Sequence, residues 1–473
     1  MPRELKANPN VVEMEYAVRG PIPQRAAELR REGRRIIPCN IGNPQALGQA
    51  PLTFPRQVMA LLEQPDRLGL ERRRAEAGAE GAYPLDAVDR AAEMLARLET
   101  GLGAYTESAG PAFVREAVAA FIDRRDRGGE DFVPADPDSI FITDGASEAV
   151  KRVLEILIAG PEDGVMIPIP QYPLYSAVIR RCGGRQVGYY PDEDRGWTLE
   201  REELDRAWEE AVAAGTRLKA IVVINPGNPT GAVLPESSVR EVIDFAEEHD
   251  LVVIADEVYQ DNTYGRPFVS FARVLGRRPV PLCSLHSVSK GFFGECGRRG
   301  GYLEVRNPPA LAGTRTTFGE LLIKQASVSL CSNTAGQAMV ELMVRPPAPG
   351  DPSHERFAAE RDHVLGELAA KAGRLKEAFA EMEGVSCPGE IGAMYLFPRL
   401  GVLPEGTGDF EYCLRLLEET GLCTVNGAGF GQAPGTHHLR IAFLPPSELL
   451  EEVLPHWVEM HRSYLAAGHK VRG

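Results

Sequence analysis

The sequence predicts an α/β protein in which helices cover a mainly parallel β-sheet. Short apolar runs in the middle of the chain alternate with stretches whose apolar residues recur at helical spacing. The run at residues 219–224 (KAIVVI) is continuous and β-branched, which is typical of a strand covered on both faces. Strands that alternate with helices in this way indicate parallel strands joined by helical crossovers.

The predicted elements follow one another between residues 139 and 285. A strand at 139–143 leads into a helix whose apolar face runs from Ala146 to Leu157, and a second helix starts near Pro235 and Glu236. Further strands are expected at residues 165–169, 219–224, 251–255 and 280–285. This block would form the centre of one large domain.

A second domain is expected because 473 residues exceed what one compact core usually holds. The Pro-rich segment 346–352 (PPAPGDP) is a plausible boundary, and it precedes a long helical pattern and short strands near 395–397 and 439–443.

We therefore predict a large domain over residues 76–345 and a smaller α/β domain built from two separate parts of the chain. Residues 1–75 would supply an N-terminal arm and part of the small domain, and residues 346–473 would supply the rest.

The net charge of −15 disfavours nucleic acid and anionic membranes as partners. The eight cysteines are scattered without a C-x-x-C pair, which is typical of reduced thiols rather than disulfides or a zinc site. No apolar run approaches the roughly 18 residues of a membrane span, and the first residues lack the apolar core of a signal peptide. We expect a soluble, cytoplasmic protein.

Lys290 carries the strongest chemical signal, in the motif SVSKG at residues 287–291. It follows a predicted strand and precedes the Gly- and Arg-rich segment 297–302, a setting that suits an imine with a phosphate-bearing aldehyde cofactor. A Gly-rich surface loop with ordinary cations is the alternative, and this stretch alone does not decide between them.

Three further motifs also stand where predicted strands end, and each has a plain structural alternative. Asn228, in NPGNPTG, could offer its amide to a ligand, or the motif could be a tight turn. Asp256 could face a pyridine nitrogen with Tyr259 nearby, or it could cap a helix. The sequence DGAS, ending in Ala146 and Ser147, could bind phosphate at a helix start or simply cap that helix.

Together these motifs, in this order, resemble the fold-type I aminotransferases that use pyridoxal 5′-phosphate, and most closely the alanine aminotransferase branch. The resemblance covers nearly the whole chain. The matching stretches are EYAVRGPI at 15–22, NIGNPQALGQAPLTFPRQV at 40–58, GAY at 103–105, PQYPLY at 170–175, SVSKGFFGECGRRGGY at 287–302, GAMYLFP at 392–398, and the last stretch from Leu439 to Pro446.

The resemblance implies a role for each site residue. Lys290 would bond to the cofactor aldehyde and carry the substrate proton, Asp256 would pair with the ring nitrogen, and Tyr172 would stack on the ring. These three are the predicted catalytic residues. Asn228 and Tyr259 would reach the ring oxygen. The phosphate would be held by Ala146, Ser147, Ser287, Arg299 and Tyr105, the last donated by the second subunit of a homodimer.

Arg440 would bind the substrate α-carboxylate, with Gly42 and Asn228 beside it. Arg299 is preferred to Arg298 because the family pattern Gly-x-Arg-x-Gly-Tyr aligns it with Gly297. The chain departs from the family at residues 332–335 and at Asn426, where polar or small residues replace expected prolines.

Two other patterns are set aside. The segment 427–431 (GAGFG) looks like part of a dinucleotide fingerprint, but no long helix is predicted after it. His437 and His438 are adjacent, so on a strand they would point to opposite faces and make a poor metal pair. We expect no metal site.

The expected reaction is transfer of the amino group of L-alanine to 2-oxoglutarate, giving pyruvate and L-glutamate. Alternatives are glutamate–glyoxylate or another transamination, a lyase reaction on the same cofactor, and a regulatory homologue without catalysis. Arg19 is a candidate for the distal carboxylate of glutamate, against the alternative of a surface or packing arginine. A fixed, buried arginine there would be left unpaired with alanine bound, so a mobile cation is expected.

Overall fold

The computed structural model describes residues 4–15, 20–129 and 131–469. Its centre is a seven-stranded sheet in which only β8 runs antiparallel to its neighbours. In sheet order the strands are β2 (Ile140–Thr143), β8 (Gly301–Arg306), β7 (Leu282–Ser287), β6 (Val252–Asp256), β5 (Arg217–Ile224), β3 (Asp163–Pro168) and β4 (Arg185–Tyr189). The mainly parallel sheet predicted from the sequence is confirmed, and each expected strand lies within two residues of its predicted ends.

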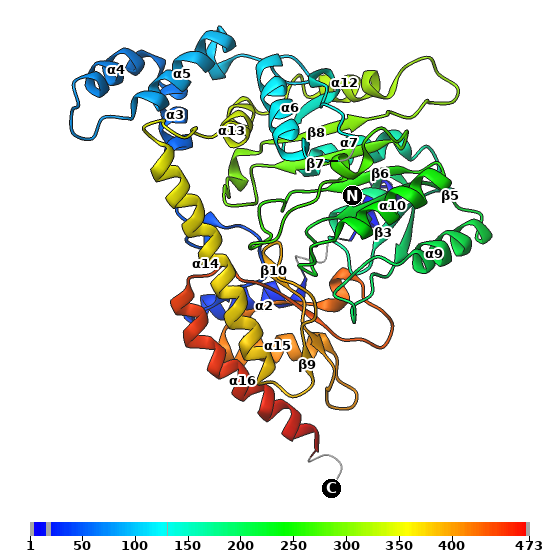
Figure 1. Cartoon of the computed structure of the whole chain (residues 1–473). Coiled ribbons are helices and arrows are strands. Elements are labelled where there is room, and N and C mark those ends of the chain that lie inside the picture. The colour runs from blue at the N-terminus through cyan, green and yellow to red at the C-terminus, as the bar shows by residue number, and fades with distance from the viewer. Residues whose placement is uncertain (1–3, 16–19, 130, 470–473) are drawn as a thin grey trace.

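Helices cover both faces of this sheet (Figure 1). Successive side chains of β5 point to opposite faces of the sheet, and both faces are apolar. Val222 packs on one face, while Ile221 and Val223 pack on the other. The first face carries α7 (Ala146–Leu157), α8 (Leu174–Cys182) and α12 (Phe318–Val328). The second carries α9 (Arg201–Ala213), α10 (Glu236–Glu248) and α11 (Phe271–Leu275).

A further group of helices extends the apolar core beyond β2. The side chains of this core come from α3 (Thr53–Glu63), α5 (Leu85–Leu98), α6 (Ala112–Asp126) and α13 (Thr334–Val344). The exposed helix α4 (Leu68–Glu76) packs on α5. The predicted domain division stays a prediction, and because α3 packs with these helices we place its first boundary nearer residue 50 than residue 75.

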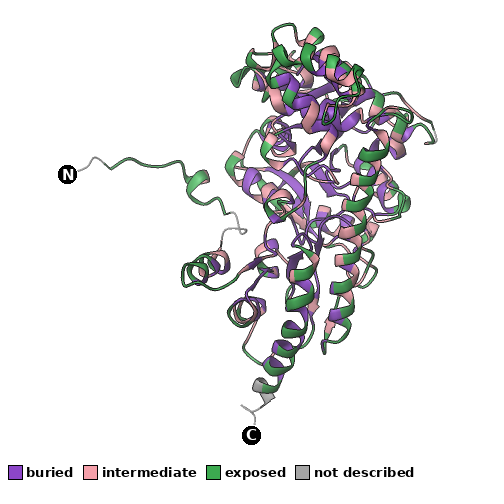
Figure 2. Cartoon of the chain, turned by 90° about the vertical axis from the view of Figure 1, so that its left-hand side faces the viewer, coloured by how far each residue is buried: buried purple, intermediate pink, exposed green. Residues whose placement is uncertain are grey.

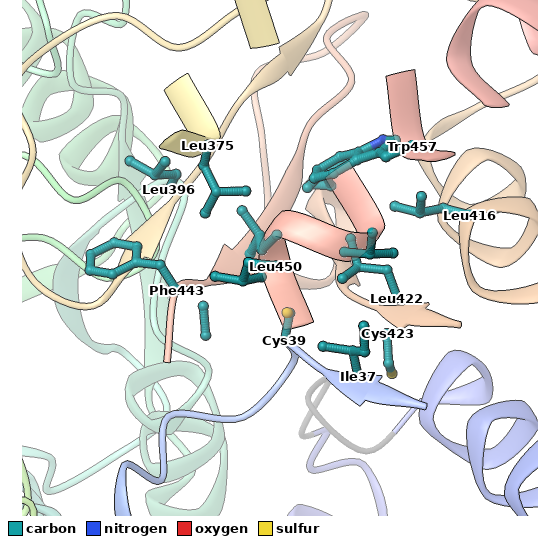
Figure 3. Packing of buried hydrophobic residues seen from close by; sticks show 14 of the residues in the cluster. Ile37, Cys39, Leu375, Leu396, Leu416, Leu422, Cys423, Phe443, Leu450 and Trp457 are labelled. Atoms are coloured by element: carbon teal, nitrogen blue, oxygen red, sulfur yellow. The ribbon is translucent and has the colours of Figure 1, made fainter. Parts of the chain in front are cut away.

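The N-terminal segment packs with the C-terminal third, as the sequence predicted. Figure 3 shows Ile37 and Cys39 next to Leu422 and Cys423, in an apolar cluster that also includes Trp457. Its helices are α2 (Pro21–Arg31), α14 (His354–Ala380), α15 (Asp409–Thr420) and α16 (Ser447–His469). Its short strands are β1 (Ile37–Pro38), paired with β12 (Leu422–Cys423), then β10 (Tyr395–Leu396), β14 (Leu439–Ala442) and β13 (Val425–Asn426) in one sheet, and β9 (Val385–Ser386) with β11 (Arg399–Leu400).

The arm at residues 4–15 projects from the body and is largely exposed (Figure 2). It holds the short helix α1 (Pro9–Val12), and Glu13 forms an ion pair with Arg180 of α8. Within the described residues no helix is both long and apolar enough to cross a membrane.

Candidate active site

A cavity of about 270 Å³ lies where the carboxyl ends of β5, β6 and β7 meet the small domain. Open α/β sheets bind ligands at this edge because strand ends and helix starts converge there. The cavity brings together most of the residues singled out in the sequence: Gly42, Ala146, Ser147, Tyr172, Asn228, Asp256, Tyr259, Ser287, Lys290, Arg299 and Arg440.

One end of the cavity has features that would suit an anion. The chain turns from β2 into α7 at Gly145, which has a φ of 78°. A Cβ at this position would lie 2.7 Å from Nη2 of Arg299, so glycine is needed both for the backbone angle and for the close approach. The free N–H groups at the start of α7, with Ser147 and Arg299 beside them, favour a phosphate.

Asp256 is the last residue of β6 and is almost fully buried. No helix follows it directly, so the helix-cap alternative does not apply. Burial raises the pKa of this carboxyl, against the opposing effects of a hydrogen bond from Tyr175 and the charge of Lys290. The hydroxyl of Tyr175 donates to Oδ2 of Asp256 at 2.8 Å. A buried carboxylate is costly unless it is paired, and a protonated ring nitrogen facing Asp256 would provide the opposite charge.

Lys290 lies three residues beyond β7 and reaches across the cavity. Its Nζ donates to the carbonyl oxygen of Gly42 at 2.6 Å and lies 6.0 Å from the centre of the Tyr259 ring. The amine therefore sits between the large domain and the N-terminal segment, where an aldehyde and a substrate would both be within reach.

Arg440, on β14, is a buried cation whose guanidinium lines the cavity and is only 2% exposed. Its Nη1 donates to Oδ1 of Asn228 at 3.1 Å and its Nη2 donates to the carbonyl oxygen of Asn40 at 2.7 Å. Within the described part of the chain its Nε has no partner and no carboxylate pairs with it. A buried guanidinium with free N–H groups is suited to a carboxylate ligand.

Comparisons with known proteins agree with this geometry. Residues 79–456 match the model of the family described as aminotransferase class I and II. The chain belongs to this family. It is 46% identical to "Alanine aminotransferase 1" of Homo sapiens, over 97% of this chain and 94% of the relative, and 43% identical to "Glutamate--glyoxylate aminotransferase 1" of Arabidopsis thaliana, over 97% and 95%.

Solved structures support the fold of this aminotransferase. The alanine aminotransferase from Pyrococcus furiosus superimposes with a TM-score of 0.76 at 25% identity, covering 97% of this chain and 100% of that one. An aspartate aminotransferase from Thermus thermophilus gives 0.72 at 21% identity, covering 97% of this chain and 100% of that one, and at that identity the likeness concerns the fold alone. The fold is therefore fold type I, as the sequence predicted.

Aminotransferases of this family use pyridoxal phosphate, and the residues present fit that cofactor. Ala146, Ser147, Ser287 and Arg299 would hold its phosphate, and Lys290 would bond to its aldehyde carbon. Asp256 would face the ring nitrogen, while Asn228 and Tyr259 would reach the ring oxygen and Tyr172 would cover the ring. These individual roles stay predictions, and they agree with the free helix start, the buried acid and the reach of the lysine described above.

Two predicted residues are not brought to the cavity by the described chain. Tyr105 is 77% exposed and does not line it, so a role at the phosphate would require a second subunit. Arg19 lies outside the described residues. Arg298 does not line the cavity either, whereas Arg299 does and donates to the carbonyl oxygen of Asp144 at 2.8 Å.

Sequence reasoning missed several residues of this site. Tyr175 supports Asp256, while Tyr395 and Cys296 line the cavity. All three stand inside stretches that carried the family resemblance, namely PQYPLY, GAMYLFP and SVSKGFFGECGRRGGY, but nothing in their spacing pointed inward. Asn40 contacts Arg440 only through its backbone oxygen, so the residue type at this position could not predict the contact.

The remaining patterns lie away from the cavity. Residues 427–431 form a short 3₁₀ turn rather than the start of a long helix. His438 is buried between Oε1 of Gln432 at 2.9 Å and Oε1 of Glu193 at 3.0 Å, and it links the large and small domains. At the departures from the family pattern, Ser332 accepts a hydrogen bond from Gln337, and Asn426 of β13 pairs with Leu439 of β14.

Proposed function

We propose that this chain transfers the amino group of L-alanine to 2-oxoglutarate, using pyridoxal phosphate in a homodimer. The observation that carries the proposal is that Lys290 and Arg440 line one cavity, where Nζ of Lys290 donates to the carbonyl oxygen of Gly42 and Nη2 of Arg440 donates to that of Asn40. The identity of 46% to alanine aminotransferases over nearly the full length supports the choice of substrate.

The lining of the cavity favours an amino acid with a small, neutral side chain. Among the described lining residues the charged groups are Asp256, Lys290, Arg299 and Arg440, and each has a role in the chemistry above. No lining cation of the described chain is left for a side-chain carboxylate. Alanine presents only a methyl group there, whereas glutamate would need a cation from outside this set.

Four side chains would take part in the reaction. The bound cofactor supplies an electron sink that makes the α-proton of the amino acid acidic. Arg440 fixes the substrate carboxylate as a bidentate pair, which orients the α-carbon. The amine of Lys290 would remove the α-proton from the amino acid and hold it at Nζ. Asp256 would balance the positive charge of the ring nitrogen, and Tyr172 would cover the ring.

A homodimer is part of the proposal because large apolar side chains are exposed on the surface around the loop that bears Tyr105. Tyr105, Val328 and Leu330 are 77%, 86% and 50% exposed. The loop that bears Tyr105 runs beside them, since Ser108 donates to the carbonyl oxygen of Leu330 at 2.8 Å. An apolar patch of this kind is typical of an interface. Light scattering at assay concentration should give a dimer, and an active monomer would contradict it.

A glutamate–glyoxylate reaction is the second candidate. Relatives of that name are 43% and 42% identical to this chain, and glyoxylate is also small and lacks a side chain that needs a cation. Both candidates share glutamate and differ in the second substrate.

The deciding experiment adds single amino acids and oxo acids to the purified, cofactor-loaded protein and follows the cofactor absorbance. We expect alanine and glutamate to convert the cofactor fastest, and pyruvate to regenerate it faster than glyoxylate. The reverse order of the two oxo acids would favour the second candidate. Conversion by aspartate faster than by alanine would overturn the substrate assignment.

A cytoplasmic location is also proposed. All eight cysteines are free thiols, which supports a reducing compartment. Several relatives are named as mitochondrial, so cell fractionation with an antibody to the chain is the direct measurement.

A further inference from the structure

Tyr395 lines the cavity but has no part in the contacts assigned above. It lies on β10, which pairs antiparallel with β14, and its register partner is Ala442. Arg440 stands two residues away from Ala442 on β14, so the side chains of Tyr395 and Arg440 emerge on the same face of this small sheet. Two side chains that are each only 2% exposed therefore meet at the cavity wall.

Aromatic rings constrain the guanidinium of Arg440. Its Cζ lies 4.3 Å from the ring centre of Tyr395 and 4.7 Å from that of Phe430. Rings so close to a planar cation attract it and limit the orientations that it can adopt. The N–H groups at its edge then point to Asn228, to Asn40 and to the cavity.

The hydroxyl of Tyr395 occupies a second functional position. It accepts a hydrogen bond from the hydroxyl of Tyr259 at 3.4 Å. A Cβ built on Gly42 would overlap this hydroxyl and would lie 3.2 Å from Nζ of Lys290. Burial would raise the pKa of Tyr395, but the charges of Lys290 and Arg440 outweigh it and leave that pKa below its usual value. The phenol therefore packs against the Gly42 backbone, on the side that also faces the lysine amine.

We propose that Tyr395 is a positioning residue for the substrate carboxylate, acting through Arg440. Its ring fixes the orientation of the guanidinium. Its hydroxyl lies beside Gly42, in space that the Cβ of any other residue at position 42 would occupy. This inference rests on the proposed function and deepens it, because it names the residue that prepares Arg440 for the amino acid.

The role of the ring is tested by comparing Tyr395→Leu with Tyr395→Phe in the cofactor-loaded enzyme. The probes are propanoate and glutarate, which carry the carboxylates of the substrates without the reacting group, and calorimetry gives their dissociation constants. We expect Tyr395→Leu to weaken both by about tenfold, the size of a lost buried cation–π contact, and Tyr395→Phe to stay within about threefold of the original protein. The KM for alanine should rise with Tyr395→Leu while kcat changes far less.

Tyr412→Phe is the matched control, because it removes another buried small-domain hydroxyl far from the cavity lining. That hydroxyl accepts from Nε1 of Trp457 at 3.0 Å and lies 3.0 Å from Nδ1 of His461. This variant should lose thermal stability and keep its affinity for propanoate. Equal propanoate affinities for Tyr395→Leu and the original protein would overturn the role of the ring.

The role of the hydroxyl is tested with Gly42→Ala, alone and together with Tyr395→Phe. The added methyl meets the phenol oxygen in the single variant, whereas that oxygen is absent from the double variant. We expect Gly42→Ala to raise the KM for alanine about tenfold in the original background and about threefold or less in the Tyr395→Phe background, since contacting residues are not additive. The same loss in both backgrounds would overturn this part of the proposal.

Propanoate binding requires no turnover, so this inference and the proposed function can fail separately. A protein that binds propanoate through Tyr395 and Arg440 but does not react with alanine would refute the substrate and uphold the positioning role. A protein that turns over alanine, with Tyr395→Leu binding propanoate normally, would refute only the positioning role.

Discussion

The two sides of the cavity are built in different ways. The side that would hold the cofactor comes from strand ends of one sheet. Asp256 is the last residue of β6, and Ser147 and Lys290 follow β2 and β7 by a few residues. The side that would hold the substrate carboxylate is assembled from Gly42, Tyr395 and Arg440, which are far apart in the chain. The first side depends on a rigid sheet, whereas the second depends on how the N-terminal segment packs against the C-terminal third.

This difference predicts a difference in kinetics. Changes on the sheet side should lower kcat because they affect the bound cofactor, and changes on the small-domain side should mainly raise KM. Variants of Asp256 on the first side and of Arg440 on the second test that division.

Lys290→Ala should have the largest effect. The lysine is expected both to bond the cofactor and to carry the proton, so steady-state transamination should fall by about 10⁴-fold or more. The protein should stay folded and still bind cofactor, as seen by absorbance and circular dichroism. Lys324→Ala, at an exposed position on α12, is the control. Turnover near that of the control would show that Lys290 has been misassigned.

Asp256→Asn should have the second largest effect. It should lower the rate of the half-reaction and leave substrate binding largely unchanged. Removing a buried electrostatic partner costs about 3 kcal/mol in comparable sites, which corresponds to roughly a hundredfold. Rapid mixing with alanine, monitored at the cofactor absorbance, gives the rate directly. A loss smaller than about tenfold would argue against a charge pair with the ring nitrogen.

Arg440→Lys should affect KM more than kcat, which is the opposite pattern. Lysine keeps the charge but loses the planar fork that binds a carboxylate at two points, so we expect the KM for alanine to rise by about tenfold or more. Steady-state rates over a range of alanine concentrations provide the measurement. If kcat fell instead while KM stayed constant, the division between the two sides of the cavity would be wrong.

Tyr175→Phe should cost about 1 kcal/mol of transition-state stabilisation, because it removes one hydrogen bond to Asp256. The donated hydrogen bond stabilises the ionised carboxylate and lowers its pKa, so its loss should raise the pKa of Asp256 further. The acidic limb of the pH–rate profile should therefore move to higher pH. An unchanged limb would mean that Tyr175 supports packing alone.

Arg19→Ala should have the smallest effect on the alanine half-reaction, which we expect to stay within about twofold because alanine carries no distal carboxylate. The glutamate half-reaction should weaken far more if Arg19 binds that carboxylate. Separate half-reactions with each amino acid make the comparison. Equal losses, or none, would remove Arg19 from the substrate site.

Most of the cofactor side could be predicted from the sequence, because its residues lie in short motifs at strand ends. The apolar run before Asp256 and the one before SVSKG placed both residues at the same edge of a parallel sheet. The domain boundary near residue 75 stays a prediction. The apolar face of α3 fits a core on either side, and only its packing against α5 and α13 shows which one it joins.

The sequence by itself therefore determined the sheet, the kind of chemistry expected at the carboxyl ends of its strands, and the family. Strand periodicity and local motifs depend on residues that are neighbours in the chain. Only the tertiary structure decided that Tyr175 supports Asp256 and that Tyr395 lies against Arg440 and Gly42. Those contacts join segments separated by tens to hundreds of residues. Their geometry follows from strand register and domain packing, which no local pattern in the sequence specifies.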